Sequence, residues 1–183
     1  MAKINGVQIK NLKSFLGHEG YCYQGKVYLN GKKLGFWSQD SWGGCDSYDF
    51  DESVLNSAVN DYKDGFPDDY ELKSVMDADS LMGDIVFLME IEKDFKKETK
   101  NGGYNTIIYF YNYFQKLCID VPTKEGRDAT EQVMNNEQLR GLVETLKKKF
   151  DTEPKVWIAR EEDFDLVVDK AHPIPEVFIH DVV

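Results

Sequence analysis

The chain has 183 residues, 42% of them apolar and 13% aromatic, and a formal net charge of −11 at neutral pH. This composition excludes a disordered chain, and the length allows one domain whose core needs no metal or disulfide. The three cysteines, Cys22, Cys45 and Cys118, lie far apart, which argues against a disulfide framework and a zinc site of paired cysteines. Because no stretch resembles a signal peptide or a membrane span, we expect a cytoplasmic protein with no membrane partner.

The negative charge is concentrated in the middle of the chain. Residues 1–39 contain six lysines and one glutamate, whereas residues 40–98 contain 17 acidic residues and five lysines. Residues 99–183 contain 15 acidic and 11 basic residues. Such a chain is repelled by nucleic acid and by anionic membranes, and it is attracted to basic surfaces. Solubility alone is the other explanation for an acidic composition.

The first predicted elements are strands. Val7 and Ile9 indicate an early strand, and the alternation of side chains over residues 21–39 predicts a β-hairpin. Its turn is Asn30-Gly31, a pair that favours a type I′ turn because both positions tolerate a positive φ. The N-terminal β region therefore covers about residues 1–45.

Two helices are predicted next. The first covers about residues 51–64, with Asp51 as its N-cap and Gly65 at its end. Its apolar face consists of Val54, Leu55, Ala58, Val59 and Tyr62. The second covers about residues 80–100 and stops at Gly102, after lysines that suit the negative end of the helix dipole. Its apolar face consists of Leu81, Ile85, Leu88, Met89 and Phe95.

The rest of the chain combines strands with one more helix. Residues 104–119 predict a long strand with apolar side chains on both sides, which indicates either a central strand or an outer face lined with tyrosines. A third helix is expected over about residues 136–150, and short strands over residues 155–160 and 176–181. This order favours a single α+β domain spanning the whole chain, with a mostly antiparallel sheet and about three helices.

One catalytic hypothesis is a magnesium-dependent nuclease, which needs two carboxylates beside a lysine. Glu71-Leu72-Lys73 with Asp49 or Asp51 supplies these residue types. However, Glu71 follows a Pro-Asp-Asp turn instead of lying in an apolar strand, and so short a motif is common by chance. The partial match of residues 60–71 to an EF-hand loop fails because Tyr62 occupies the third ligand position.

The second catalytic hypothesis is a thiol hydrolase. Cys45 follows two glycines, and its candidate bases are His18, His172 and His180. Nothing in the sequence brings any of these histidines to Cys45. We therefore expect a protein that is not an enzyme, with no catalytic residues, no metal site and no cofactor.

The N-terminal hairpin carries a family resemblance. The segment from Asn30 to Asp40, followed by Trp42-Gly43-Gly44, resembles a segment of small acidic proteins from phages and mobile elements of Firmicutes. Some of these are anti-CRISPR inhibitors of type II RNA-guided nucleases. The resemblance covers at most about residues 4–65 and includes no catalytic motif. It implies a non-enzymatic inhibitor that binds the nuclease and stops it engaging or cutting DNA, but it assigns no site residues.

The expected partner is a basic protein surface, with a type II CRISPR effector nuclease as the candidate. Such nucleases hold nucleic acid in a positively charged channel, where carboxylates can replace phosphates. The expected contact residues are Asp46, Asp49, Asp51, Glu52, Asp61, Asp64, Asp68, Asp69 and Glu71. An alternative binding surface is the tyrosine row Tyr109, Tyr111 and Tyr113, whose affinity for a partner would depend little on salt.

Overall fold

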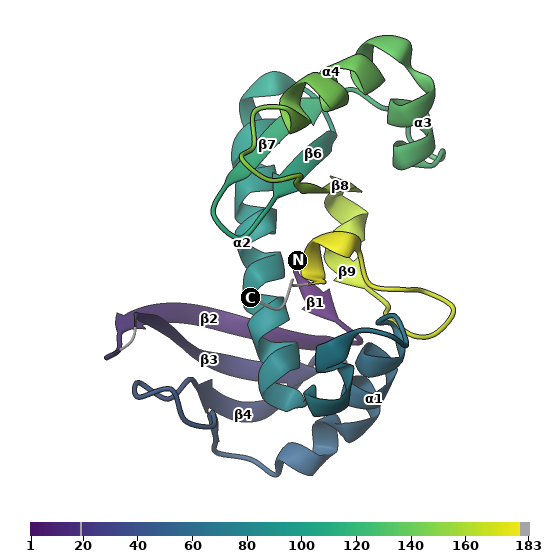
Figure 1. Cartoon of the computed structure of the whole chain (residues 1–183). Helices are drawn as coiled ribbons and strands as arrows, with labels where there is room; N and C mark the ends of the chain where they lie inside the picture. Colours follow the sequence, from purple (N-terminus) through teal and green to yellow (C-terminus); the bar gives the residue numbers. More distant parts are fainter. Residues whose placement is uncertain (19, 180–183) are drawn as a thin grey trace.

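The computed structural model describes residues 1–18 and 20–179. Over these residues the α+β class is confirmed, with two β-sheets placed along one long helix (Figure 1). The strands of this part of the chain are β1 (Lys3–Ile4), β2 (Val7–Leu16), β3 (Tyr21–Leu29), β4 (Lys32–Ser38), β5 (Ser47–Tyr48), β6 (Thr106–Tyr111), β7 (Lys116–Val121), β8 (Lys155–Arg160) and β9 (Asp165–Leu166).

The helices of the described residues exceed the predicted three. The α-helices are α1 (Asn56–Asp64), α2 (Ala78–Gly102), α3 (Ala129–Asn135) and α4 (Glu137–Lys147). The 3₁₀ helices are η1 (Glu52–Leu55), η2 (Glu71–Val75), η3 (Glu161–Phe164) and η4 (Glu176–Phe178). Among the α-helices of the described residues, the one that the sequence did not predict is α3.

The predicted hairpin is confirmed as the antiparallel pair β3–β4. Asn30 and Gly31 at its turn have φ angles of 50° and 81°, as a type I′ turn requires. Over the described residues the larger sheet has the order β5-β4-β3-β2-β1-β9. Its pairs are antiparallel except β1–β9, which is parallel, so that the expectation of mostly antiparallel pairing holds.

The predicted helix over residues 51–64 begins as a 3₁₀ turn. Asp51 caps this turn, η1, by accepting a hydrogen bond from the backbone N–H of Ser53, and α1 follows directly. Val54 is 44% exposed, so its place on the buried face was wrong. A 3₁₀ helix has three residues per turn instead of 3.6, which rotates this position away from the face that Leu55 and Ala58 share.

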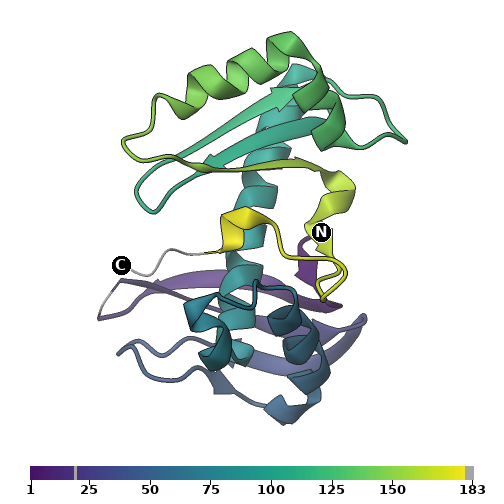
Figure 2. The same cartoon turned by 45° about the vertical axis from the view of Figure 1, so that its right-hand side comes forward.

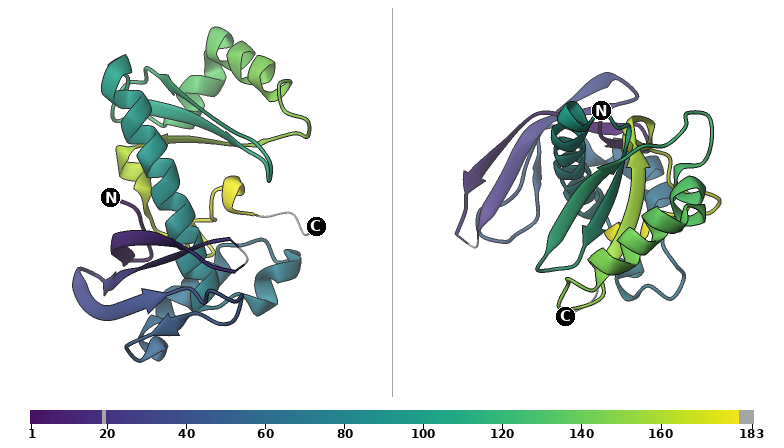
Figure 3. Two further views of the ribbon diagram at one scale, coloured as in Figure 1. Left: turned by 90° about the vertical axis from the view of Figure 1, so that its left-hand side faces the viewer. Right: turned by 90° about the horizontal axis from the view of Figure 1, so that it is seen from above.

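The second predicted helix is confirmed as α2, with slightly wider bounds. Asp77 caps its start by accepting a hydrogen bond from the backbone N–H of Ser80. Gly103 ends it with a φ of 70°, a left-handed conformation that glycine adopts at little cost. The helix runs along both sheets, as Figure 3 shows, and packs against β1 and β2 of the larger sheet and β6 and β7 of the smaller sheet.

The prediction of one strand over residues 104–119 was wrong, because the segment is the hairpin β6–β7. The carboxamide oxygen of Asn112 accepts hydrogen bonds from the backbone N–H groups of Phe114 and Gln115, which closes the turn. Aromatic residues in this turn continue the apolar run of the two strands. The hydrophobic periodicity of the sequence therefore does not show where the turn lies. The smaller sheet of the described residues has the order β7-β6-β8, so the central position predicted for this segment is confirmed for β6.

The third predicted helix is confirmed as α4. Asn136 caps it by accepting hydrogen bonds from the backbone N–H groups of Gln138 and Leu139. Together α3 and α4 cover the face of the smaller sheet that is turned away from the larger sheet (Figure 2). The strand expected over residues 176–181 was wrong for Glu176–Phe178, which form η4, and residues 180 and 181 lie outside the described residues.

Two hydrophobic clusters fill the structure. The main cluster packs the larger sheet, α1 and α2 against one face of the smaller sheet, including Ile107 and Tyr109 of β6. The second cluster packs the other face of β6, through Ile108 and Phe110, against α3 and α4. No helix in the described part of the chain is both long and apolar enough to cross a membrane.

Candidate functional site

Four of the nine predicted carboxylates are hydrogen-bonded within the fold: Asp46, Asp49, Asp51 and Asp68. Asp51 caps η1, as described above, and Asp49 accepts a hydrogen bond from the backbone N–H of Phe36 in β4. A Cβ atom at Gly35 would lie 2.0 Å from Oδ1 of Asp49, so glycine leaves the space that this carboxylate occupies. Asp49 and Asp51 therefore stabilise the chain between β4 and α1.

The third of these carboxylates, Asp46, belongs to a network that ties the β4–β5 loop to α2. Its Oδ2 accepts a hydrogen bond of 2.7 Å from the indole Nε1 of the fully buried Trp37. Asp79 of α2 accepts hydrogen bonds from the backbone N–H of Asp46 at 3.0 Å and from the hydroxyl of Tyr48 at 2.7 Å. Burial, together with the nearby charges of Asp79 and Asp77, raises the pKa of Asp46 to about 6.

A second group of carboxylates has no such bonds. The side chains of Asp61, Asp64, Asp69 and Glu71 are exposed and make no hydrogen bond or ion pair with any other described residue. Glu52 is exposed too. Partial desolvation of its carboxyl group, together with the nearby charges of Asp79 and Asp77, raises its pKa. We call these five residues, Glu52, Asp61, Asp64, Asp69 and Glu71, the acidic surface.

The remaining predicted carboxylate, Asp68, forms an ion pair of 2.8 Å with Lys73. Lys73 also donates a hydrogen bond of 2.7 Å to the carbonyl oxygen of Phe66, so its ammonium group closes the turn between α1 and η2. The lysine of the proposed nuclease motif therefore binds Asp68. The described residues contain no group of three or more His, Cys, Asp or Glu side chains that could hold a metal ion.

The residues of the thiol hypothesis are dispersed. Cys45 is exposed and makes no hydrogen bond to a histidine of the described residues. The ring of His18 stacks on Trp42, with 4.6 Å between the ring centroids, and Nδ1 of His172 lies 3.0 Å from Oδ1 of Asp169. His180 lies outside the described residues.

The predicted tyrosine row does not form one surface. Tyr109 is 1% exposed and faces the main cluster, where it stacks against the half-buried Tyr111. Tyr113 lies in the β6–β7 turn and is 73% exposed, beside Phe114, which is 82% exposed. The two rings pack edge to face at 5.0 Å, and together they form an aromatic tip that the sequence analysis did not predict.

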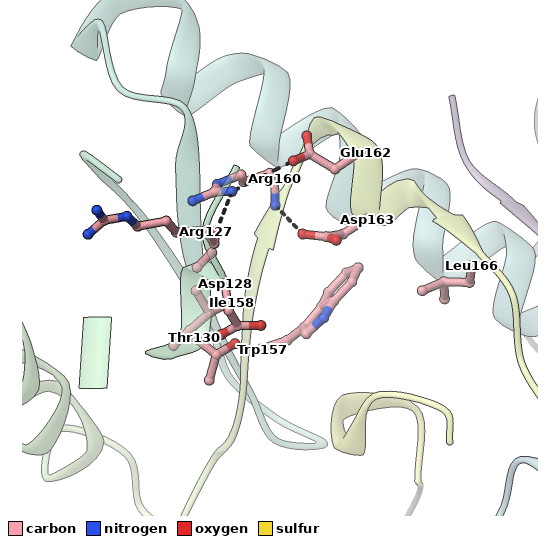
Figure 4. Close-up of a pocket in the computed structure, with 10 residues that line it drawn as sticks. Arg127, Asp128, Thr130, Trp157, Ile158, Arg160, Glu162, Asp163 and Leu166 are labelled. Carbon is pink, nitrogen blue, oxygen red and sulfur yellow. Dashed lines mark hydrogen bonds and ion pairs between the residues drawn. The ribbon is translucent and has the colours of Figure 1, made fainter. Parts of the chain in front are cut away.

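A polar cavity of about 350 Å³ lies beside β8, and Arg160 is among the residues that line it (Figure 4). Arg160 is 6% exposed and donates hydrogen bonds to the carbonyl oxygens of Arg127 and Lys124, both at 2.8 Å, and to the hydroxyl of Thr123 at 3.0 Å. These bonds hold the loop between β7 and α3 against β8. The buried cation therefore has a structural role in the smaller sheet.

Scans against models of protein families, curated proteins and solved structures found no match. Function must therefore be argued from this chain's own residues.

Sequence reasoning missed the residues whose role depends on contacts between distant segments. Asp79 meets Asp46 across 33 positions of the chain, and Arg160 meets Thr123 across 37. In the sequence, Asp79 is distinguished only by its place near the start of a helix. Arg160 is distinguished only by its place at the end of a strand. Only the fold shows that the first joins the β4–β5 loop to α2 and that the second is a buried cation.

Proposed function

We propose that the protein binds a basic macromolecular surface through the acidic surface, without catalysing a reaction. The observation that supports this is the exposure of four carboxylates, Asp61, Asp64, Asp69 and Glu71, that have no partner among the described residues. Asp61 and Asp64 lie three positions apart in α1 and are therefore neighbours on the helix, where like charges destabilise each other. A basic partner removes this repulsion.

The partner that we propose to test first is an RNA-guided DNA nuclease. Its nucleic-acid channel is lined with Lys and Arg, and carboxylates placed there compete with phosphates for the same cations. The resemblance of the N-terminal hairpin to phage and mobile-element proteins supports this choice. In this mechanism the protein acts by occupying the channel, so that DNA does not engage.

The test combines association with a DNA-cleavage assay, using the full chain and a type II nuclease loaded with guide RNA. We expect binding that slows cleavage and weakens as salt rises, because the Debye length shortens from about 10 Å at 0.1 M to about 3 Å at 1 M. Charge reversal to Lys at four positions of the acidic surface should weaken binding by at least about tenfold. These positions are Asp61, Asp64, Asp69 and Glu71.

A matched control separates this local effect from the effect of total charge. Four exposed glutamates outside the acidic surface are reversed to Lys instead: Glu125, Glu131, Glu137 and Glu144. The control should keep most of the affinity, although it changes the net charge by the same amount. Equal losses in both variants, or inhibition that survives the first variant, would contradict binding through the acidic surface. Failure of wild type to associate or inhibit would eliminate this nuclease as the partner.

The aromatic tip supports a second candidate function, a docking surface for an apolar partner. Tyr113 and Phe114 are large side chains held in the open by a closed turn, and exposed aromatic pairs are enriched at protein interfaces. The affinity of the aromatic tip for a partner would change little with salt, because the contact is apolar. Between roughly 0.1 and 1 M salt, screening instead removes the contribution of the carboxylates to binding. Replacing both residues by Ser therefore distinguishes the two functions.

A further inference from the structure

The larger sheet has an outer face that is turned away from the main cluster. On its inner face Val7, Ile9, Val27 and Trp37 are fully buried in this cluster, to which α1 and α2 also belong. Side chains of a strand point alternately to the two faces of a sheet. The residues that alternate with the buried ones in β2, β3 and β4 are exposed or only partly buried. These three strands therefore present a continuous outer face to the solvent.

Backbone pairing places lysines and aromatic rings side by side on this outer face. Lys10 of β2 pairs with Lys26 of β3, which in turn pairs with Phe36 of β4. In the next row of the sheet, Tyr28 of β3 pairs with Lys33 of β4. Directly paired residues lie on the same face, with about 4.5–5.5 Å between their Cβ atoms. With Lys13, which pairs with β3 two positions before Lys26, these residues form what we call the basic face: Lys10, Lys13, Lys26, Lys33, Tyr28 and Phe36.

The positive charge of the basic face has no counterpart in the described fold. The strands β2, β3 and β4 contain no acidic residue, and the four lysines make no ion pair with any other described residue. Lys10 and Lys26 lie directly opposite each other, where like charges destabilise a sheet. Lysines often protect an exposed strand edge, but Lys26 lies in β3, which pairs with strands on both sides. An anion bound between these lysines would remove their repulsion.

The aromatic rings of the basic face have two different roles. The Nζ atom of Lys10 lies 4.4 Å from the centroid of the Tyr28 ring, and this cation–π contact positions the ammonium group without neutralising its charge. Phe36 is 39% exposed, so part of its ring is open to a ligand. Proteins that bind single-stranded nucleic acid combine these features, because cationic groups contact the phosphates while aromatic rings stack on the bases.

We propose that the basic face binds a single strand of DNA or RNA, with a base stacked on Phe36 and phosphates against the four lysines. A double strand is a poorer ligand, because its bases are stacked inside the duplex and only its phosphates can reach this face. The inference is independent of the proposed function, which uses the acidic surface and a basic partner.

The net charge of −11 does not prevent this binding. Glu52, Asp61 and Asp64 of the acidic surface belong to η1 and α1, which pack on the main cluster, on the opposite side of the larger sheet. Asp49 borders β4, but its carboxylate fills the space beside Gly35, a residue that pairs with the buried Val27. At 0.1 M salt the Debye length is about 10 Å, so the lysines in direct contact determine most of the field that a bound strand experiences.

The experiment measures fluorescence anisotropy of labelled oligo(dT) and oligo(rU) of about 16 nucleotides, titrated with the full chain. Both strands should bind, because neither stacking nor phosphate contact requires the 2′-hydroxyl. A duplex of the same length should bind at least about fivefold more weakly. Four phosphate contacts predict a slope of about −2.8 for log K against log salt, since each contact to a single strand contributes about −0.7. Failure of both strands to bind, or equal affinity for the duplex, would overturn the proposal.

A double variant, Lys26→Gln with Lys33→Gln, tests the phosphate contacts. It should weaken binding of oligo(dT) at least about tenfold at low salt and reduce the slope by about 1.4. The matched control is Lys148→Gln with Lys149→Gln, at exposed positions after α4, because it changes the net charge by the same amount. Equal losses in the two double variants would mean that only the total charge matters, and would contradict a site on this face.

Two substitutions of Phe36 test the stacking. Phe36→Leu keeps an apolar side chain but removes the ring, and should weaken binding of oligo(dT) at least about fivefold. Phe36→Trp keeps a ring and should retain the affinity. Thermal unfolding of both variants shows that they are folded. Unchanged binding in Phe36→Leu would overturn the proposed mode of binding.

Poly-L-arginine, as a second probe, separates this inference from the proposed function. Charge reversal at Asp61, Asp64, Asp69 and Glu71 should remove binding to poly-L-arginine but leave oligo(dT) bound. The double variant of Lys26 and Lys33 should have the opposite effect. Wild type that binds only one of the two probes therefore shows which proposal has failed.

Discussion

The two sheets of this protein lie beside partly or fully buried side chains of opposite charge type, and neutral groups supply many of the hydrogen bonds that these side chains make. Beside the larger sheet, Asp46 and Asp84 accept hydrogen bonds from Trp37 and Tyr62. Beside the smaller sheet, Arg160 donates mainly to carbonyl and hydroxyl oxygens. The exposed carboxylates of the acidic surface lie on η1, α1, η2 and the turn before η2, on the same side of the molecule as the larger sheet, and this is why we assign binding of a basic partner to that side.

The two regions also differ in their packing. The larger sheet belongs entirely to the main cluster, whereas β6 of the smaller sheet contributes residues to both clusters. The main cluster crosses from one sheet to the other along α2, which favours cooperative unfolding of the whole chain. The single-domain expectation stays a prediction, and the strongest test uses neighbouring residues on β6.

Tyr109→Ala and Phe110→Ala should each lower the free energy of unfolding by about 3–5 kcal/mol, because each removes a fully buried aromatic ring. Tyr109 faces the main cluster and Phe110 faces α3 and α4. If the chain is one cooperative unit, both variants shift the same single transition in urea, followed by circular dichroism and tryptophan fluorescence. A separate early transition in Phe110→Ala alone, or proteolysis that releases two stable fragments, would show two domains.

Arg160→Met should lower the free energy of unfolding by about 2–4 kcal/mol, since it leaves the carbonyl oxygens of Lys124 and Arg127 without their charged donor. Amide exchange in the loop between β7 and α3 should also become faster. Arg140→Met, at an exposed position of α4, is the control and should change stability by no more than about 0.5 kcal/mol. Similar effects of both substitutions would mean that the buried hydrogen bonds contribute little.

Asp46→Asn tests the buried charge beside the larger sheet and has the smallest expected effect. The pKa of Asp46 is raised to about 6 from 3.8, so its protonated form favours the fold. That contribution is fully present below the ordinary pKa and is lost as pH rises through about 6. The full shift corresponds to roughly 3 kcal/mol, which solvent screening at this half-buried site reduces to about 1 kcal/mol.

The asparagine side chain retains an acceptor for the indole of Trp37 but does not titrate. Stability of Asp46→Asn relative to wild type should therefore improve by about 1 kcal/mol between pH 4 and pH 7, measured by urea unfolding at each pH. Glu92 contributes the opposite dependence of stability on pH. This contribution is the same in wild type and in Asp46→Asn, so it cancels when the two proteins are compared. Burial alone would raise the pKa of Glu92, but hydrogen bonds from Lys96, Ala2 and the N-terminus lower it. A constant difference across this range would show that Asp46 is not perturbed.

Local sequence signals predicted the elements whose causes are local. The Asn30-Gly31 turn and the caps Asp51 and Asn136 were correct, because each depends on one residue and its near neighbours. The hairpin β6–β7 was missed because Tyr113 and Phe114 keep the aromatic run unbroken through a turn. The helix α3 was missed because it has only 7 residues, too few to show a helical period.

The sequence by itself determined the α+β class and the acidic middle segment, since composition and periodicity are properties of the chain. Only the tertiary structure decided which carboxylates stay exposed and which ones stabilise the fold. Asp46 and Asp61 look alike in the sequence, yet one bonds to a buried tryptophan and the other has no partner among the described residues. The same is true of Asp84, which is 7% exposed and accepts a hydrogen bond from Tyr62, 22 positions away in the sequence. Burial and hydrogen bonding are set by contacts between distant segments, and local patterns carry no information about them.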